Sequence, residues 1–261
     1  MTAGICSAFP ATKTWEIDMA RSFLIRGMLC GVAAGLLVFL FAKFLGEPAV
    51  DGAIGVEDAI AKAAGDAPEP ELVSRAVQAS WGLLTATMVY SVAIGGLFSL
   101  AFAFAWGRVG RLSARATSVL IAGAAFVSIY LIPNLKYPAN PPSVGNPETI
   151  GYRTELYFGM IVISLIAMLA AVNLGRGLWS KLDHWHALIL SGLAYVAIII
   201  VANLVLPSIN EVPAQFPAVL LWQFRLASLG MQLILWTVLG LGFGELTHRA
   251  MLPQRLAARR A

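Results

Sequence analysis

Apolar residues are gathered along the chain in six long blocks, and polar stretches separate them. The blocks cover residues 22–45, 76–106, 116–133, 156–174, 187–206 and 226–246, and the core of the second lies at 81–105. A helix needs about 20 apolar residues to cross the hydrocarbon core of a bilayer. The sequence lacks the short alternating segments that are typical of transmembrane β-barrels. The pattern therefore predicts an all-α, polytopic bundle of six transmembrane helices.

Three polar stretches that contain prolines interrupt this pattern, at residues 47–75, 135–158 and 206–217. Proline lacks a backbone N–H and disfavours the helical conformation in the residue before it. We therefore expect no regular helix through 135–158, and in 47–75 only a short interfacial helix near 56–64. The many acidic residues of 47–75 indicate a solvated loop, or alternatively an electronegative surface that concentrates cations.

Composition supports the membrane class. The chain is 59% hydrophobic and 12% charged, with a mean hydropathy of +0.77, whereas soluble domains have about 45–50% apolar and about 25% charged residues. The net charge of +4 does not indicate a nucleic-acid partner, because the basic residues flank the spans and form no single basic face. We divide the chain into a disordered N-terminal extension (1–21), a six-helix transmembrane domain in the lipid bilayer (22–247) and a basic cytoplasmic tail (248–261). Met19 is an alternative start of the chain.

The distribution of positive charge predicts the orientation in the membrane. Most of the 18 lysines and arginines fall in the N-terminal segment, in the short loops 107–115 and 175–186, and in the C-terminal tail. Basic loops remain in the cytoplasm. We therefore expect both termini in the cytoplasm and the three proline-containing stretches outside, an arrangement that requires an even number of spans.

Glycines indicate where helices approach each other closely. Gly27, Gly31 and Gly35 recur every four residues in the first span. A helix face without side chains lets a second helix come near, so we assign these three glycines to helix packing. The glycines of LGLGFGE at 239–245 receive the same assignment, because they lie too deep in an apolar block to hold a phosphate.

A weak internal repeat groups the charged residues. Each odd-numbered span ends in a polar stretch with proline, and each even-numbered span is preceded by an arginine, which is consistent with three helical hairpins. This arrangement would bring arginines and acids to one level near the outer interface, where charges need partners. They form either interface-anchoring ion pairs or a gate. The candidates for an entrance or gate are Glu47, Arg75, Lys136, Asn140, Glu148, Arg153, Glu155, Glu211 and Arg225.

The sequence carries little catalytic or metal-binding chemistry. It has no nucleotide-binding glycine loop and no HExxH motif, and the nearest acid–base group, Tyr152 with Arg153 and Glu155, does not make a convincing active site. We expect no enzymatic activity and no tightly bound cofactor. His184 and His186 flank Trp185 beside Asp183. On an extended connector they would share a face, but two ligands make a weak metal site, and an ordinary loop is the alternative interpretation.

Several motifs resemble those of the CbtA family of proposed cobalt transporter subunits. They are FLIRGMLCGVAAG at 23–35, FAKFLGEPAVDGAI at 41–54, SRAVQ at 74–78, LKYPANPPSVGNPETIGYRT at 135–154 and NEVPAQFPAVLLWQFRLASLG at 210–230. The proline-rich motif at 135–154 is the most specific of them. Residues 1–18 extend beyond the usual beginning of the family, and the two histidines are not among its recognised features.

The resemblance implies a multi-pass protein of the bacterial inner (cytoplasmic) membrane that belongs to a cobalt uptake system linked to cobalamin supply. It also implies a small single-span partner subunit with a histidine-rich tail, which would explain why this chain has so few metal ligands. The transported divalent cation would then be cobalt. The alternative is a scaffold or assembly subunit that transports nothing. The sequence leaves open whether copies of the chain form a homo-oligomer.

Overall fold

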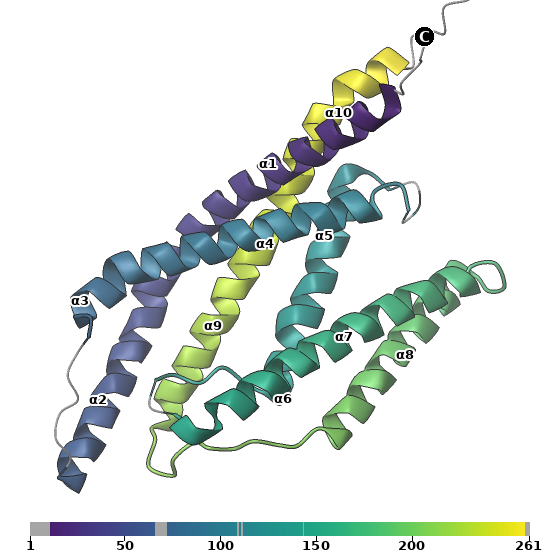
Figure 1. The fold of residues 1–261 in the computed structure, drawn as a ribbon. Helices are drawn as coiled ribbons and strands as arrows, with labels where there is room; N and C mark the ends of the chain where they lie inside the picture. The colour runs from purple at the N-terminus through teal and green to yellow at the C-terminus, as the bar shows by residue number, and fades with distance from the viewer. Residues whose placement is uncertain (1–10, 66–71, 109, 111, 143, 259–261) are drawn as a thin grey trace, which may run out of the picture.

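The structure is a computed structural model that describes residues 11–65, 72–108, 110, 112–142 and 144–258. Within these ranges all regular secondary structure is helical, and six helical segments are long and apolar enough to cross a membrane. The predicted six-span helical bundle is therefore confirmed, and the chain is a multi-pass membrane protein (Figure 1).

Several of the six segments combine α-helices with π-helical or 3₁₀ turns. In chain order the elements are α1 (Ala11–Phe41), η1 (Ala42–Gly46) and α2 (Glu47–Ala64); α3 (Arg75–Val77), η2 (Gln78–Gly82) and α4 (Leu83–Ala105); α5 (Ala114–Ala125), η3 (Phe126–Leu131) and α6 (Ile132–Lys136); η4 (Pro147–Thr149) and α7 (Ile150–Leu178); α8 (His184–Val205); and α9 (Ala218–Val238), η5 (Leu239–Phe243) and α10 (Gly244–Ala258).

Three expectations about irregular segments are wrong. Helix α1 begins at Ala11, so part of the expected disordered extension is helical, and residues 1–10 lie outside the described residues. The expected loop after the first span is helical from its first residue, because α2 begins at Glu47 and includes the short helix expected near 56–64. Helix α7 begins at Ile150, inside the stretch where we expected no helix. Asn146 caps the 3₁₀ turn before α7, because its side-chain Oδ1 accepts a hydrogen bond from the Glu148 N–H at 3.0 Å. Pro147 is the first residue of that turn, a position that does not need a backbone N–H.

The first segment is much longer than a bilayer requires. The apolar helical stretch Met19–Ala64 has 46 residues, which corresponds to about 70 Å at 1.5 Å per residue. The hydrocarbon core is only about 30 Å thick. In Figure 1, α2 bends away from α1 and extends past the ends of the neighbouring helices. Since its acidic residues Glu57 and Asp58 are exposed, we assign the far part of α2 to the aqueous side.

Four of the six segments contain a π-helical turn, namely η1, η2, η3 and η5. In hydrocarbon, each backbone polar group must find a partner within the protein. Three carbonyl groups in these turns accept side-chain hydrogen bonds from another segment. Lys43 Nζ donates to Ala79 O at 2.9 Å, and Ser118 Oγ donates to Gly240 O at 2.7 Å and to Leu239 O at 3.5 Å. These bonds connect the first segment to the second and the third to the sixth.

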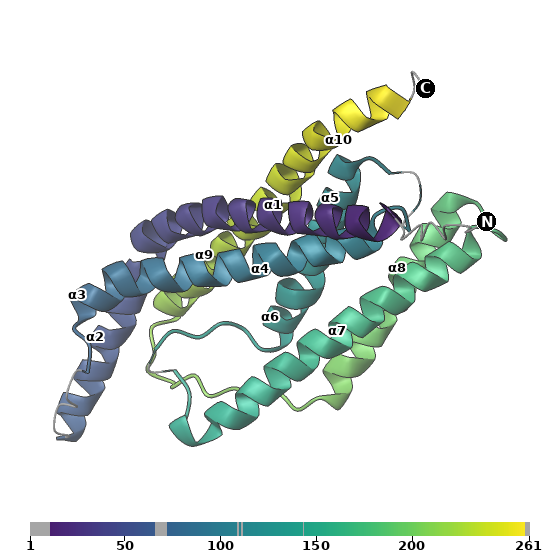
Figure 2. The same cartoon turned by 45° about the horizontal axis from the view of Figure 1, so that its top comes forward.

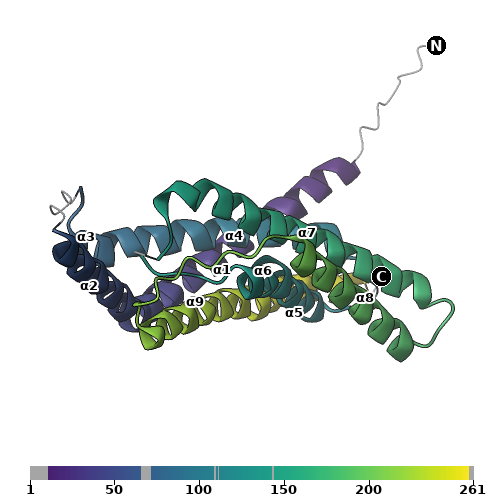
Figure 3. The same cartoon turned by 90° about the horizontal axis from the view of Figure 1, so that it is seen from below.

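The helices pack in an order that differs from the expected repeat. Helix α1 lies along α4, α5 lies along η5 and α10, and α7 lies along α8. Figures 2 and 3 show the α7–α8 hairpin at one side of the bundle. Helices α5 and α6 lie between this hairpin and the remaining helices. The packed pairs are thus the first with the second segment, the third with the sixth, and the fourth with the fifth. Three consecutive hairpins are therefore not the packing units.

The glycines of α1 let its backbone contact that of α4 directly. A Cβ atom on Gly31 would lie 2.5 Å from Ser91 O, and one on Gly27 would overlap Gly95 O. A Cβ on Gly35 would lie 3.0 Å from Met88 Sδ. Gly27, Gly31 and Gly35 thus all face α4. At Gly27 and Gly31 the backbone of α4 leaves no room for a Cβ atom, and at Gly35 the contact is tight.

A second glycine face joins the third and sixth segments. A Cβ on Gly240 would come within 2.8 Å of Ala122 Cβ, and one on Gly244 would come within 3.0 Å of Ser118 Cβ. At the same contact, Arg115 Nε pairs with Glu245 Oε2 at 2.6 Å. The pair of segments is thus held by close backbone approach and by one ion pair near its end.

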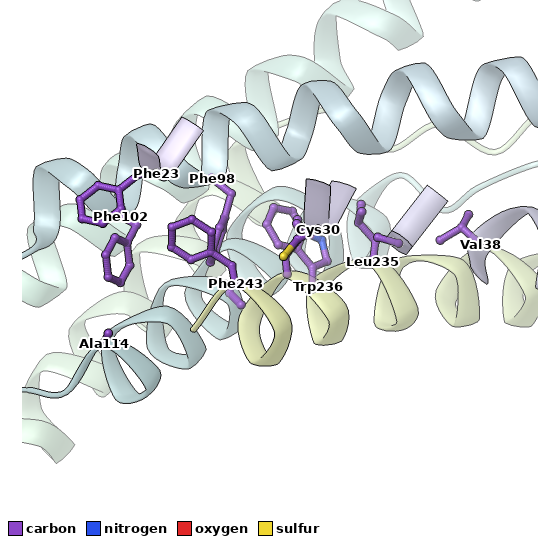
Figure 4. Packing of buried hydrophobic residues seen from close by; sticks show 12 residues of the cluster. Phe23, Cys30, Val38, Phe98, Phe102, Ala114, Leu235, Trp236 and Phe243 are labelled. Atoms are coloured by element: carbon purple, nitrogen blue, oxygen red, sulfur yellow. The ribbon is translucent and has the colours of Figure 1, made fainter. Parts of the chain in front are cut away.

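Four phenylalanine rings close the interior near the end of the bundle where α1 begins and α10 ends, which we call the terminal end. The ring centroid of Phe243 lies 6.3, 5.4 and 4.9 Å from those of Phe23, Phe98 and Phe102. The corresponding interplanar angles are 63°, 89° and 73°. Edge-to-face geometry is the favoured arrangement of aromatic pairs. Figure 4 shows these rings in one row with Cys30 and Trp236. We call Phe23, Phe98, Phe102 and Phe243 the phenylalanine cluster.

The glycine contact between α1 and α4 can be tested by adding one methyl group. We expect Gly31→Ala to destabilise the purified protein by roughly 1–3 kcal/mol, because the methyl group would be forced against backbone atoms. Gly159→Ala is the matched control, since nothing lies within 4 Å of its Cβ position in α7. Alanine is the better helix former, so the control should be neutral or slightly stabilised. Thermal unfolding in detergent measures both, and equal midpoints would contradict the close contact.

Candidate functional site

A polar pocket of about 620 Å³ opens at the end of the bundle opposite the phenylalanine cluster. We call this the connector end, because the irregular connectors 137–146 and 206–217 lie there. Both connectors, the first turns of α7 and one residue of α9 form the walls of the pocket. The residues that line it are Tyr137, Pro138, Asn140, Val144, Ile150, Arg153, Thr154, Tyr157, Phe158, Ile209, Asn210, Glu211, Val212 and Arg225.

Glu211 fastens the two connectors to each other. Its carboxylate accepts hydrogen bonds from the Asn146 backbone N–H at 2.8 Å and from Thr149 Oγ1 at 2.7 Å. Its Oε2 atom lies 3.4 Å from Arg153 Nε. These donors favour the ionised form, so the hydrogen bonds from Asn146 and Thr149, together with the Arg153 charge, hold the pKa of Glu211 below its usual range.

Arg153 is held in place by the connector in front of α7. Its Nη2 donates to Asn146 O at 3.1 Å. The guanidinium occupies the space beside Gly145, where a Cβ atom would overlap it. Gly145 also has a φ of +114°, which side chains disfavour. The Nε atom of Arg153 is buried and makes no hydrogen bond within the part of the chain that the structure describes.

Arg225 reaches the pocket from α9 on the other side. Its Nε donates to Ala139 O at 3.2 Å, and its Nη2 donates to Asn140 Oδ1 at 3.0 Å. These are neutral acceptors, and no carboxylate among the described residues pairs with Arg225. The side chain is partly buried. Arg225 thus brings a positive charge that its surroundings do not neutralise.

The charges that line the pocket do not suit a bare metal cation. Two guanidinium groups, of Arg153 and Arg225, face one carboxylate, that of Glu211, so the net charge is positive. A dication about 4 Å from one guanidinium meets a repulsion of roughly 8 kcal/mol at an effective dielectric constant of about 20. Glu211 already pairs with Arg153. We conclude that the pocket walls alone do not hold a divalent cation.

A separate ion cluster joins α2 to α3. Arg75 pairs with Glu47 and, through Nε at 2.9 Å, with Asp51. Glu47 is largely buried, with 11% of its side chain exposed. Arg75 and Glu47, which we proposed as members of one gate with Arg153 and Arg225, do not line the pocket. Arg75 and Glu47 instead form an ion pair that fixes the start of the second segment against α2 of the first.

Three further gate candidates also lie outside the pocket walls. Lys136 donates to Asn203 O at 2.8 Å and to Ser208 Oγ at 3.3 Å, close to the connector 206–217. Glu148 and Glu155 are exposed. Asn140, Arg153, Glu211 and Arg225 are therefore the sequence-derived candidates that the structure brings together.

We expected the two histidines to lie on an extended connector, and this expectation is wrong. Asp183 is the N-cap of α8, and His184 is its first residue. Successive helical residues turn by about 100°, so His184 and His186 differ by about 200° around the axis and do not share a face. His186 Nδ1 instead pairs with Asp183. Among the described residues no group of three or more histidine, cysteine or acidic side chains is arranged to hold a metal ion.

Three tyrosines belong to the helices around the pocket and the bundle interior. Tyr157 of α7 lines the pocket. Tyr130 donates to Ser228 Oγ at 3.1 Å. Tyr90 also lines a second cavity of about 340 Å³.

The second cavity has mainly apolar walls at the level of the spans. Thr87, Ser91, Met231 and Gln232 belong to its lining. The hydroxyl of Ser91 is buried and has no hydrogen-bond partner among the described residues. This cavity is separate from the connector-end pocket, since the two share no lining residue.

Sequence reasoning did not identify Gly145, Asn146, Thr149 and Tyr157 as parts of the site. The signal for three of them lies in GNPET at 145–149. An asparagine followed by proline is typical of a helix start, and this would have indicated that α7 begins there. The partnership of Thr149 with Glu211 spans 62 positions, and no local pattern reveals it.

The fold and the site define a multi-pass helical membrane protein with a polar pocket at one end of its bundle. The chain matches the family model described as "Probable cobalt transporter subunit (CbtA)" over residues 20–248. It therefore belongs to the CbtA family, as the motifs indicated. The family description names cobalt as the transported ion, and the word subunit implies a partner protein. No curated protein and no solved structure matches significantly.

The depressed pKa of Glu211 predicts a pH-dependent stability. The ionised carboxylate stabilises the joined connectors, so its contribution is complete above the pKa of an unfolded glutamate, about 4.3, and is lost as the pH falls through the lower folded value. At pH 7 we expect Glu211→Gln to unfold at a lower temperature than the unchanged protein. Thermal unfolding between pH 7 and pH 3 should show this difference narrowing. A difference that stays constant would contradict the role of the charge.

Gly145 can be tested independently of charge. We expect Gly145→Ala to displace the Arg153 guanidinium and to loosen residues 144–149, because the residue would need both a positive φ and space that Arg153 fills. Faster amide hydrogen exchange of this segment by mass spectrometry would show the change. Gly151→Ala is the control, since its Cβ position has no neighbour within 4 Å. Unchanged exchange in Gly145→Ala would contradict the proposed contact.

Proposed function

We propose that the chain is the membrane subunit of a cobalt uptake system linked to cobalamin supply, in the cytoplasmic membrane of a bacterium. Membership of the CbtA family supports the ion and the subunit role. The observation that favours transport is the polar pocket of about 620 Å³ at the connector end. At the other end of the bundle, the rings of the phenylalanine cluster pack against one another. A bundle open at one end and closed at the other has the form of a transport protein in one of its states.

The connector end faces outward in this proposal, and both termini are cytoplasmic. Basic residues near the termini and in the segments 106–113 and 179–183 support this orientation. A membrane potential that is negative inside then assists the entrance of a dication by about 4–5 kcal/mol per 100 mV, from ~2.3 kcal/mol per charge. Cobalt is the cargo in this proposal, and the chain needs no tightly bound cofactor and no catalytic step.

Metal capture belongs to the partner subunit in this proposal. The pocket is positively charged, and no metal-binding group of three side chains occurs among the described residues. We therefore propose a small single-span partner with a histidine-rich tail, which supplies the ligands and delivers the ion to the connector end. Asn140, Arg153, Glu211 and Arg225 form the receiving entrance, and Lys136 lies near it.

The second candidate function is that of a scaffold that transports nothing. The glycine contact of α1 with α4 and the phenylalanine cluster favour it, because both produce a tightly closed bundle. The pocket at the connector end favours transport over this alternative, since helix packing alone does not require an open pocket lined by charged side chains.

Uptake of radioactive cobalt in cells tests the proposal. We expect cells that express the chain together with the partner to accumulate cobalt above cells that carry an empty vector. Glu211→Gln should reduce this uptake, because the entrance loses the carboxylate that joins its walls. Glu57→Gln, in the exposed part of α2, should leave uptake unchanged.

Controls for expression decide how the uptake result is read. Each variant must be present in the membrane at an equal amount, as shown by immunoblot. Uptake at the empty-vector level, both with and without the partner, would overturn the transport proposal and favour the scaffold.

A further inference from the structure

We infer that the connector-end pocket binds an oxyanion, a carboxylate or phosphate group, between Arg153 and Arg225. The inference concerns a ligand of the pocket itself and goes beyond cobalt uptake. Its first basis is the charge of Arg225. This residue lies within the apolar segment Ala218–Leu252, and a cation in such a segment requires a partner. The described residues provide only neutral acceptors for it.

The second basis is the set of guanidinium donors that remain free. Arg153 Nε is buried beside Glu211 Oε2 at 3.4 Å. Its Nη2 donates to Asn146 O, and its Nη1 makes no hydrogen bond within the described part of the chain. Arg225 donates from Nε to the backbone oxygen of Ala139 and from Nη2 to the side-chain Oδ1 of Asn140. Its Nη1 makes no hydrogen bond within the described part of the chain. Arginine donors of this kind match the oxygens of a carboxylate or phosphate.

The third basis is the shape and surroundings of the pocket. Its volume of about 620 Å³ falls within the range of about 300–1,000 Å³ that small-molecule sites occupy. The pocket lies where connectors meet the apolar spans, so two sources can supply the oxyanion: a soluble anion or the phosphate of a lipid headgroup. Bound there, the oxyanion would neutralise Arg225.

Binding to the purified chain tests the inference without any transport step. The protein is kept in a neutral detergent and titrated with inorganic phosphate or citrate, and in a second arm with phosphatidylglycerol against phosphatidylcholine. We expect at least one of the three anionic probes to raise the unfolding temperature and to bind in calorimetry. A response to phosphate or citrate identifies a soluble ligand, and a response to phosphatidylglycerol alone identifies a lipid phosphate.

Matched arginine variants locate the binding in the pocket. Arg225→Gln should weaken it by about tenfold or more, as expected for the loss of a charge-assisted hydrogen bond. Arg225→Lys, which keeps the charge, should weaken it less. Arg176→Gln removes an exposed arginine near the other end of α7 and should change nothing. Size-exclusion chromatography establishes that each variant is folded.

Two outcomes would overturn the inference. One is that none of the anionic probes binds to the unchanged protein. The other is that Arg225→Gln, or Arg225→Lys if the glutamine variant does not fold, binds the probe as tightly as Arg176→Gln. Because the assay contains neither cobalt nor the partner, its failure is separate from a failure of the uptake experiment.

Discussion

The rest of the bundle depends on the contact between the backbones of α1 and α4. Gly27, Gly31 and Gly35 have no side chains that would hold α4 away, so the backbones of the two helices are in van der Waals contact along several turns. Between helices in lipid, such packing replaces the hydrophobic driving force that is weak there. Helix α1 also contacts α9 and η5. The α1–α4 pair thus forms the frame against which α9 places Arg225 at the connector end.

The candidate site combines two features that point in different directions. The family is described as a probable cobalt transporter subunit, yet two arginines and one carboxylate that is already paired make the pocket positive. The difference is resolved if the metal arrives with ligands of its own, because the repulsion applies to a bare ion. Glu211 then has a structural role, because it joins two connectors that are far apart in sequence. Arg153 lies beside this junction and lines the pocket.

The sequence predicted the helical bundle and its six spans because each apolar block is long enough to cross a bilayer by itself. It also predicted the packing glycines, because their spacing of four residues places them on one face of a single helix. It predicted only the second half of α2, since the acidic residues before it indicated a loop, and the burial of Glu47 depends on its pairing with Arg75 in a distant part of the sequence. The same limit applies to the pocket. The charged residues were recognised, but whether Arg153 meets Glu211 or another acid depends on contacts between distant segments.

The pairing of the third segment with the sixth has a consequence for how the protein is made. A chain that inserts from its N-terminus places α5 in the membrane before η5 has been synthesised. Until then Ser118 lacks the Gly240 carbonyl and Arg115 lacks Glu245. The third segment therefore completes these contacts only after the sixth segment has been made. A chain that ends before residue 239 leaves the Ser118 hydroxyl and the Arg115 guanidinium without these partners, so the bundle is complete only with its last helix.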